Sequence, residues 1–213
     1  MTLRPLTSRF RRFRRDEDGA TLVEFGLVAA FFLFLAFGLI DFGRLGFSYV
    51  MAQKATERAV RLAVVQAPIC LGVPVINQRN PLSSANTALT VGMSCSADPT
   101  LCQTETTVSC SADHTQTGLE IYNQIRTLLP TNATAANLRF SYAFDPDLGF
   151  LGGPYTPVVT AELEELNFEF VTPIGALATV IGANSSTTIG EEFAFPSMSN
   201  SLPAEALFDG ESS

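Results

Sequence analysis

The sequence predicts an α+β fold, in which a long apolar helix near the N-terminus precedes a small antiparallel-sheet head domain with a disulfide-rich loop. Three observations support this fold: an uncharged apolar run over 25–40, four cysteines clustered within 68–114, and alternating apolar residues further along the chain. Hydrophobic residues make up 46% of the 213 residues and charged residues only 16%, a composition that excludes a disordered chain and a coiled-coil rod.

The apolar run has the length of a membrane span. From Ala20 to Ile40 there are 21 residues, of which Glu24 is the one charged residue. As a helix this segment rises about 30 Å, which matches the hydrocarbon core of a bilayer. A buried helix of a soluble protein is the alternative interpretation, but we expect a lipid bilayer to surround this segment.

The charges are distributed very unevenly. Six of the 13 basic residues lie in the first fifteen positions, whereas from Pro68 onward three arginines stand against fifteen carboxylates. Basic flanks of a membrane span stay on the cytoplasmic side, so we expect a cytoplasmic N-terminus and an exported C-terminal part. No nucleic-acid partner is expected, because topology accounts for the arginines and the acidic body would repel phosphate.

A helical pattern continues beyond the span to Gln66, and Pro68 ends it. Small residues recur along one stripe of this extension, at Ala52, Ala55, Ala59 and Ala63. Such a stripe allows either close packing against another helix or packing on the chain's own head. The sequence leaves both interpretations open.

The cysteines predict two disulfides, because their number is even and the chain is expected to be exported. They are Cys70, Cys95, Cys102 and Cys110. Four cysteines allow three pairings, and the sequence does not choose among them. A local pair such as Cys102–Cys110 would staple a loop with little regular structure. No C-x-x-C pair is present, which argues against a zinc site.

Beyond His114 the pattern predicts one helix, over 116–129, and several strands. The strands are expected at Asn137–Phe144, Pro157–Leu163, Glu165–Val171 and Thr187–Phe195. The loop Asp145–Gly149 reads as a turn, and the turn explains its aspartates better than a Ca²⁺ site does. The tail from Ser197 onward is expected to be flexible.

Glu24 needs a partner, because a carboxylate inside an apolar membrane helix costs about 2.5–3.5 kcal/mol. A cut after Gly19 would create a new amine on Ala20. Residues four apart share one face of a helix, so Glu24 would be able to neutralise this amine, or that of a neighbouring copy. The alternative is a carboxylate that reaches the membrane boundary.

A basic leader, the segment Gly19-Ala20-Thr21-Leu22-Val23-Glu24-Phe25, and an apolar helix together resemble the N-terminal signal of type IV prepilins. The match is most similar to TadE-like pseudopilins of the Flp/Tad pilus system. The continuations Gly38-Leu39-Ile40-Asp41-Phe42-Gly43-Arg44 and Ala55-Thr56-Glu57-Arg58-Ala59-Val60-Arg61 are also similar to that family. The specific resemblance covers about residues 16–66.

This resemblance implies a minor pilin or pseudopilin that helps to initiate, assemble or tip a pilus used in adhesion or secretion. Its implied partners are a prepilin peptidase that cuts between Gly19 and Ala20, other pilins and the inner-membrane Tad assembly platform. The domains would be a cytoplasmic leader (1–19), a membrane and pilin-like helix (20–66) and a periplasmic or extracellular head (67–213). The alternative is a TadG-like protein that stays anchored in the inner membrane and does not join the filament.

Catalytic chemistry is not expected. The single histidine, His114, lies in a polar loop, and neither a phosphate-binding glycine loop nor a His-Glu-x-x-His motif is present. We therefore expect no enzyme, no cofactor and no metal centre, and place the functional residues at Gly19, Ala20 and Glu24.

Overall fold

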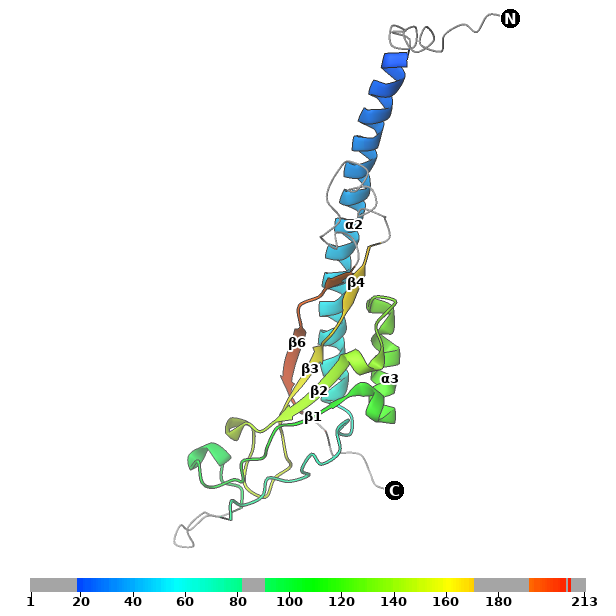
Figure 1. Ribbon diagram of the computed structural model, residues 1–213. Coiled ribbons are helices and arrows are strands. Elements are labelled where there is room, and N and C mark those ends of the chain that lie inside the picture. Colours follow the sequence, from blue (N-terminus) through cyan, green and yellow to red (C-terminus); the bar gives the residue numbers. More distant parts are fainter. Residues whose placement is uncertain (1–18, 82–90, 171–191, 206, 208–213) are drawn as a thin grey trace, which may run out of the picture. The chain divides into compact units, whose positions relative to one another are not determined.

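The computed structural model describes residues 19–81, 91–170, 192–205 and 207 (Figure 1). Contacts divide the chain into two units. The first consists of Met1–Arg44 and Glu169–Glu191, and the second of Leu45–Phe168 and Glu192–Ser213. Residues 1–18 of the predicted leader, residue 171 at the end of the third predicted strand and residues 187–191 of the last one lie outside the described residues.

Helix α2 spans Ala20–Ala63, so the long N-terminal helix predicted from the sequence is confirmed. It ends three residues earlier than the expected Gln66. The N–H of Val64 donates to the carbonyl of Val60 at 3.0 Å, and the chain then turns ahead of Pro68. The turn precedes the proline because proline disfavours helical geometry in the residue before it.

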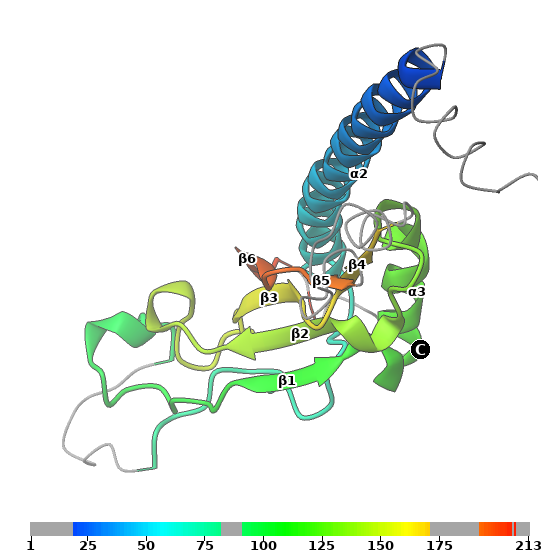
Figure 2. The ribbon, with the colours of Figure 1, turned by 45° about the horizontal axis from the view of Figure 1, so that its top comes forward.

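The head contains a four-stranded antiparallel sheet in the order β1-β2-β3-β6, which confirms the predicted fold class (Figure 1). Its strands are β1 (Val108–Ser111), β2 (Leu138–Ala143), β3 (Val158–Leu163) and β6 (Met198–Pro203). Figure 2 shows β2 between β1 and β3. Strands β4 (Asn167–Glu169) and β5 (Glu192–Ala194) form a separate two-stranded sheet.

One face of the four-stranded sheet is apolar and buried. Phe140 on β2 stands opposite Ala161 on β3, and both side chains are fully buried. Leu138, Tyr142, Val159 and Leu163 continue this face. The alternate residues, such as Arg139 and Thr160, lie on the solvent face. The alternation predicted for these two strands is therefore the alternation that forms the core.

The distal half of α2 covers the buried face of the sheet. The small residues Ala52, Ala55, Ala59 and Ala63 are each 0% exposed. Asn200 on β6 lies in register with Ala161 on that face, and its Nδ2 donates to Oγ1 of Thr56 at 2.6 Å. The alanine stripe therefore packs on the chain's own head, which decides between the two interpretations left open by the sequence.

The tail prediction was wrong, because Met198–Pro203 is strand β6 and pairs with β3 over six residues. Its inward positions include Asn200, an amide that bonds to α2, so the apolar alternation is interrupted where the strand is buried. The short strand β1 was also missed. Helix α3 (Gln116–Ile125) ends before the predicted residue 129 and continues as a 3₁₀ turn at Arg126–Leu128. Further 3₁₀ turns are Cys95–Ala97, Ala112–His114, Ala135–Asn137 and Pro146–Leu148.

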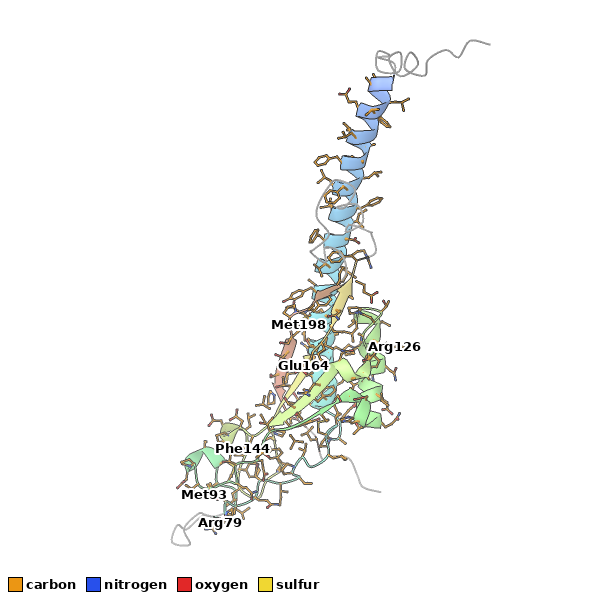
Figure 3. The ribbon with its side chains drawn as sticks, viewed as in Figure 1. Arg79, Met93, Arg126, Phe144, Glu164 and Met198 are labelled. Atoms are coloured by element: carbon orange, nitrogen blue, oxygen red, sulfur yellow. A yellow bond between two sulfur atoms is a disulfide. The ribbon has the colours of Figure 1, made fainter. Side chains whose placement is uncertain are left out.

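The connection between α2 and β1 and the loop between β2 and β3 together form a small lobe of short irregular strands. Residues 149–155 pair with 91–95 on one side, through Gly92 and Leu151, and with 75–77 on the other, through Asn77 and Gly153. Residues 78–80 then pair with 101–103. Leu101 and Leu151 fill the interior, with Met93 and Phe144 packed against them (Figure 3).

The two predicted disulfides are present, as Cys70–Cys110 and Cys95–Cys102. The local pair Cys102–Cys110 does not form. Cys95–Cys102 joins the first and last strands of the lobe and so closes its ring of hydrogen bonds. Cys70–Cys110 ties the segment after α2 to strand β1. The loop that a Cys102–Cys110 pair would have stapled was expected to have little regular structure, but Cys110 lies on strand β1.

Candidate functional site

The predicted cleavage boundary coincides with the start of α2. Ala20 is the first residue of the helix, Gly19 precedes it, and both are exposed. A Cβ atom built on Gly19 would meet no atom within 4 Å. The Gly19–Ala20 bond is therefore accessible in the described part of the chain, as a processing site requires.

Glu24 lies on the exposed surface of α2, one turn after Ala20. Because the intervening residues are helical, Glu24 and Ala20 share a face. The helix thus has the spacing that the sequence predicted for a carboxylate beside a new N-terminal amine. That pairing itself remains a prediction.

The first half of α2 exposes an apolar surface whose contact with water is energetically unfavourable. One 18-residue window has a mean hydropathy of 2.4, and none of it is buried within the chain. More than half of the surface is exposed at Leu22, Val23, Phe25, Leu27, Val28, Phe31, Phe32, Leu35 and Leu39. Each such side chain gains roughly 1.5–3 kcal/mol when it is buried. This helix is long and apolar enough to cross a membrane once.

Asp41 is the functional candidate that the sequence analysis did not single out. Its side chain is only 1% exposed, and its Oδ1 lies 3.3 Å from Nη1 of Arg44. The next residue, Phe42, packs edge-to-face against Phe170 with ring centroids 6.2 Å apart. The helix rises about 30 Å from Ala20 to Asp41, so this ion pair stands where a perpendicular span leaves the hydrocarbon core. The sequence signal by which Asp41 could have been identified is a single acidic residue directly after the apolar run.

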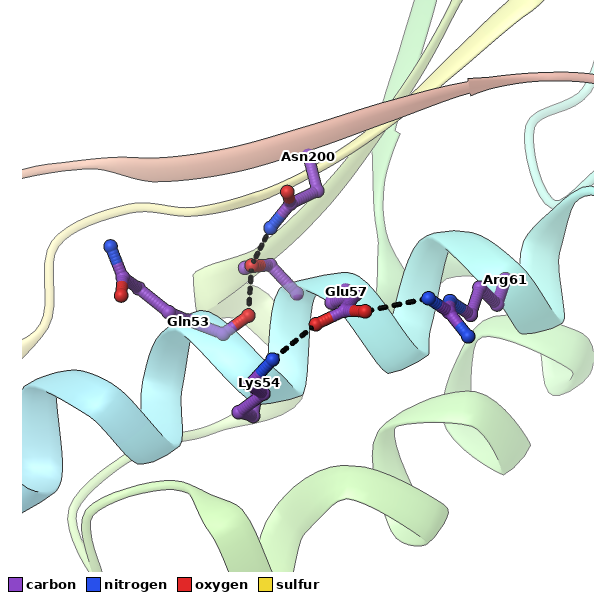
Figure 4. Close-up of polar contacts among 6 residues, drawn as sticks. Gln53, Lys54, Glu57, Arg61 and Asn200 are labelled. Carbon is purple, nitrogen blue, oxygen red and sulfur yellow. Dashed lines mark hydrogen bonds and ion pairs between the residues drawn. The ribbon is translucent and has the colours of Figure 1, made fainter.

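The distal half of α2 carries two sets of polar contacts, one that bonds it to β6 and one among its own side chains (Figure 4). In the first, Oγ1 of the buried Thr56 donates to the carbonyl of Gln53 at 2.8 Å and accepts from Asn200. In the second, Glu57 accepts from Lys54 at 2.8 Å and from Arg61 at 2.6 Å. A polar groove of about 480 Å³ is lined by Tyr49, Gln53, Lys54 and Glu57 of α2 and by Ser197–Asn200.

Two tyrosines in the head titrate outside their usual range. Burial raises the pKa of Tyr142 to about 12, although its hydroxyl accepts a hydrogen bond from the N–H of Ile69 at 2.9 Å. Burial, with a contribution from the carboxylate of Glu105, raises the pKa of Tyr155 to about 12. Both side chains are buried in the packed core, so their raised pKa values bear on how the free energy of unfolding depends on pH.

The aspartates of the described loops serve as turn residues. The carboxylate of Asp145 accepts the N–H of Asp147 at 3.0 Å and caps the short helix that follows. The hydroxyl and N–H of Thr100 donate to Asp98 and lower the pKa of that carboxyl. Within the described ranges, no three His, Cys, Asp or Glu side chains gather as metal ligands.

Comparison with known proteins identifies the class to which the helical segment is similar. The family model described as TadE-like protein matches residues 19–61. The match begins at the predicted cleavage boundary and follows α2 almost to its end. It therefore confirms the resemblance seen in the sequence, over the apolar span, the Asp41–Arg44 pair and most of the alanine stripe. Searches of curated proteins and of solved structures give no significant match.

Proposed function

We propose that this chain is a minor pilin or pseudopilin of a Tad pilus. The leader holds the N-terminus in the cytoplasm, α2 crosses the inner membrane, and the head lies on the far side. A prepilin peptidase cuts after Gly19, and the mature chain takes part in starting, assembling or tipping the pilus. The observation that carries this proposal is the bare apolar surface of α2, which follows directly after the Gly19–Ala20 boundary in a segment that matches TadE-like proteins.

In this proposal the mature helix passes from lipid into an apolar bundle of pilin helices. The lipid and the helix bundle would each bury the apolar side chains of α2 that are otherwise exposed to water. Glu24 would be costly in either place unless it found a partner. The new amine of Ala20, from the same copy or from a neighbour, supplies a positive charge at the required face. The head stays outside the bundle, because the alanine stripe of α2 is already covered by the chain's own sheet.

A test of this proposal follows the chain in cells that make the pilus. Sheared pili and inner membranes are separated, and the chain is detected in each fraction. We expect the mature chain in both fractions and the precursor only in membranes. A Glu24→Gln chain should be cut but should fall at least several-fold in the sheared fraction. Gly26→Ala is the matched control, because its Cβ would meet no atom within 4 Å.

The competing proposal is a permanently anchored, TadG-like assembly protein. It predicts that the chain stays with the inner membrane when pili are sheared off, and that Glu24→Gln changes nothing in its distribution. Either of these results would overturn incorporation into the pilus.

A further inference from the structure

The outer face of the distal half of α2 carries a basic stripe, which we define as Lys54, Arg58 and Arg61. The spacings of four and three residues place the three side chains on one face of the helix. The fully buried alanines lie on the opposite face. Lys54 and Arg61 keep 66% and 68% of their side-chain surface exposed, and Arg58 is exposed as well. Arg58 and Arg61 therefore face solvent, and Lys54 lies at the edge of the stripe, where it also lines the groove beside Ser197–Asn200.

Glu57 neutralises only part of this stripe. It pairs with Lys54 at 2.8 Å and with Arg61 at 2.6 Å, which fixes two of the three cations in position. Arg58 makes no ion pair with any residue that the structure describes. Three cations and one carboxylate leave a formal charge of +2. Exposed ion pairs of this kind contribute little to stability, so the stripe gains little from its internal pairs alone.

The solvent face of the sheet carries the opposite charge, on an acidic ridge that we define as Glu162, Glu164 and Glu165. Glu162 alternates with the buried Ala161 and Leu163, so it belongs to the face that α2 does not cover. Nε of Arg139, on the same face, lies 3.4 Å from Oε2 of Glu164. Three carboxylates and one arginine leave a formal charge of −2.

The turn that bears the ridge is held rigidly. The side-chain amide of Asn137 donates to the carbonyls of Glu164 and Glu165 at 3.2 Å each. Glu165 has a φ of 54°, a left-handed conformation that glycine or asparagine adopts at lower cost. An exposed glutamate therefore occupies a position at which its backbone is strained, and its side chain points into solvent.

We propose that the basic stripe of one copy docks against the acidic ridge of a second copy of this chain. The two surfaces are complementary in charge, and they lie on opposite faces of the head, with the sheet between them. A contact between different faces of identical subunits is heterologous, and it extends into a helical row when its rotation does not close. Identical heads would thus stack front to back.

A second copy fits as the partner because this chain itself carries an acidic surface that complements the basic stripe. From Pro68 onward the sequence has fifteen carboxylates and three arginines, so the basic stripe is the exception on an acidic head. Charge complementarity of this kind sets orientation and association rate more than affinity, and it weakens with salt. Both surfaces lie in the head unit, so the contact does not depend on cleavage after Gly19.

The chain allows an unusually direct test, because Lys54 is its only lysine. Full-length precursor, half of it labelled with ¹⁵N, is reconstituted in phosphatidylcholine vesicles and treated with a carbodiimide, which joins an amine to a carboxylate in direct contact. We expect mixed-isotope peptides that join Lys54 to Glu162, Glu164 or Glu165, and their loss at high salt. The Lys54–Glu57 product within one copy stays monomeric and carries a single isotope.

Charge reversal supplies the second arm of the test. Arg58→Glu and Glu165→Arg should each lower the intermolecular yield at least threefold, and the double variant should restore it. Arg126→Glu reverses an exposed charge outside both surfaces and should have no effect. The proposal is overturned if Lys54 forms no mixed-isotope product, if it joins other carboxylates, or if Arg58→Glu leaves the yield unchanged. Such results would leave the pilin assignment untouched, since cleavage and pilus incorporation are measured separately.

Discussion

The two disulfides close loops of very different length, and their removal should therefore cost different amounts of stability. Cys70–Cys110 joins residues 40 positions apart, whereas Cys95–Cys102 joins residues only 7 apart. The loop-closure relation gives about 4 kcal/mol for the longer loop and about 2.4 kcal/mol for the shorter one at 25 °C. We predict that the Cys70→Ala/Cys110→Ala chain is less stable than the Cys95→Ala/Cys102→Ala chain by about 1.5 kcal/mol.

The structure makes this comparison a fair one. Cys70, Cys95 and Cys102 are at most 3% exposed and Cys110 is half-buried, so the Cys70–Cys110 pair buries no more sulfur surface than the Cys95–Cys102 pair. The longer loop runs from the segment after α2 into strand β1 and encloses the shorter loop, which lies entirely within the lobe. The difference in free energy then reports mainly the entropy of the unfolded chain.

The assay is urea unfolding of the full chain in detergent micelles, followed by circular dichroism, for the parent and both double variants. Both variants should keep the slope of the unfolding transition and lower its midpoint, with the larger shift for Cys70→Ala/Cys110→Ala. Equal shifts, or a larger shift for the lobe variant, would refute the reasoning. Either result would mean that the lobe supports the sheet through its own packing rather than through loop closure.

Three further changes test the packing of the head. Ala59→Leu should destabilise the chain by about 1–3 kcal/mol, because its 0% exposed side chain leaves no room for three more carbons. Thr56→Val should cost about 1–2 kcal/mol, because it removes the acceptor that Asn200 uses at 2.6 Å. Stability should fall as the pH rises from 10 to 12, because the folded pKa values of Tyr142 and Tyr155 are about 12 and the unfolded chain loses these protons first.

Each of these predictions has a control measured in the same urea assay. Arg58→Leu, on the exposed face of α2, should leave the urea midpoint almost unchanged, whereas Ala59→Leu should lower it. In a double-mutant cycle, Thr56→Val and Asn200→Leu should be less than additive, and strict additivity would contradict a direct bond. Tyr155→Phe should flatten the loss of stability at alkaline pH, and an identical loss in that variant would argue against Tyr155 as a titrating group.

The uncharged apolar run predicted the helix through its length and composition, and the alternation in the core strands predicted their burial directly. The run over 25–40 and the alternation through Leu138, Phe140 and Tyr142 each correspond to one surface of the fold. Strand β6 was missed because its inward position 200 is an asparagine, whose burial depends on a hydrogen bond to Thr56 rather than on an apolar side chain. That partner lies 144 residues away in the sequence, beyond the reach of any local pattern.

The candidate site was predicted where local chemistry defines it. Gly19, Ala20 and Glu24 form a pattern within six consecutive positions, and the start of α2 at Ala20 agrees with it. The disulfide pairing depends instead on which strands become neighbours. The acidic ridge likewise exists only because β3 places Glu162 on the face opposite α2.

The N-terminal sequence of the chain recovered from cells with an active prepilin peptidase tests the central claim most directly. The account predicts a mature chain that begins at Ala20, without the six arginines of the leader, and an uncut precursor when the peptidase is absent. A chain that still begins upstream of Ala20 when the peptidase is active would contradict it.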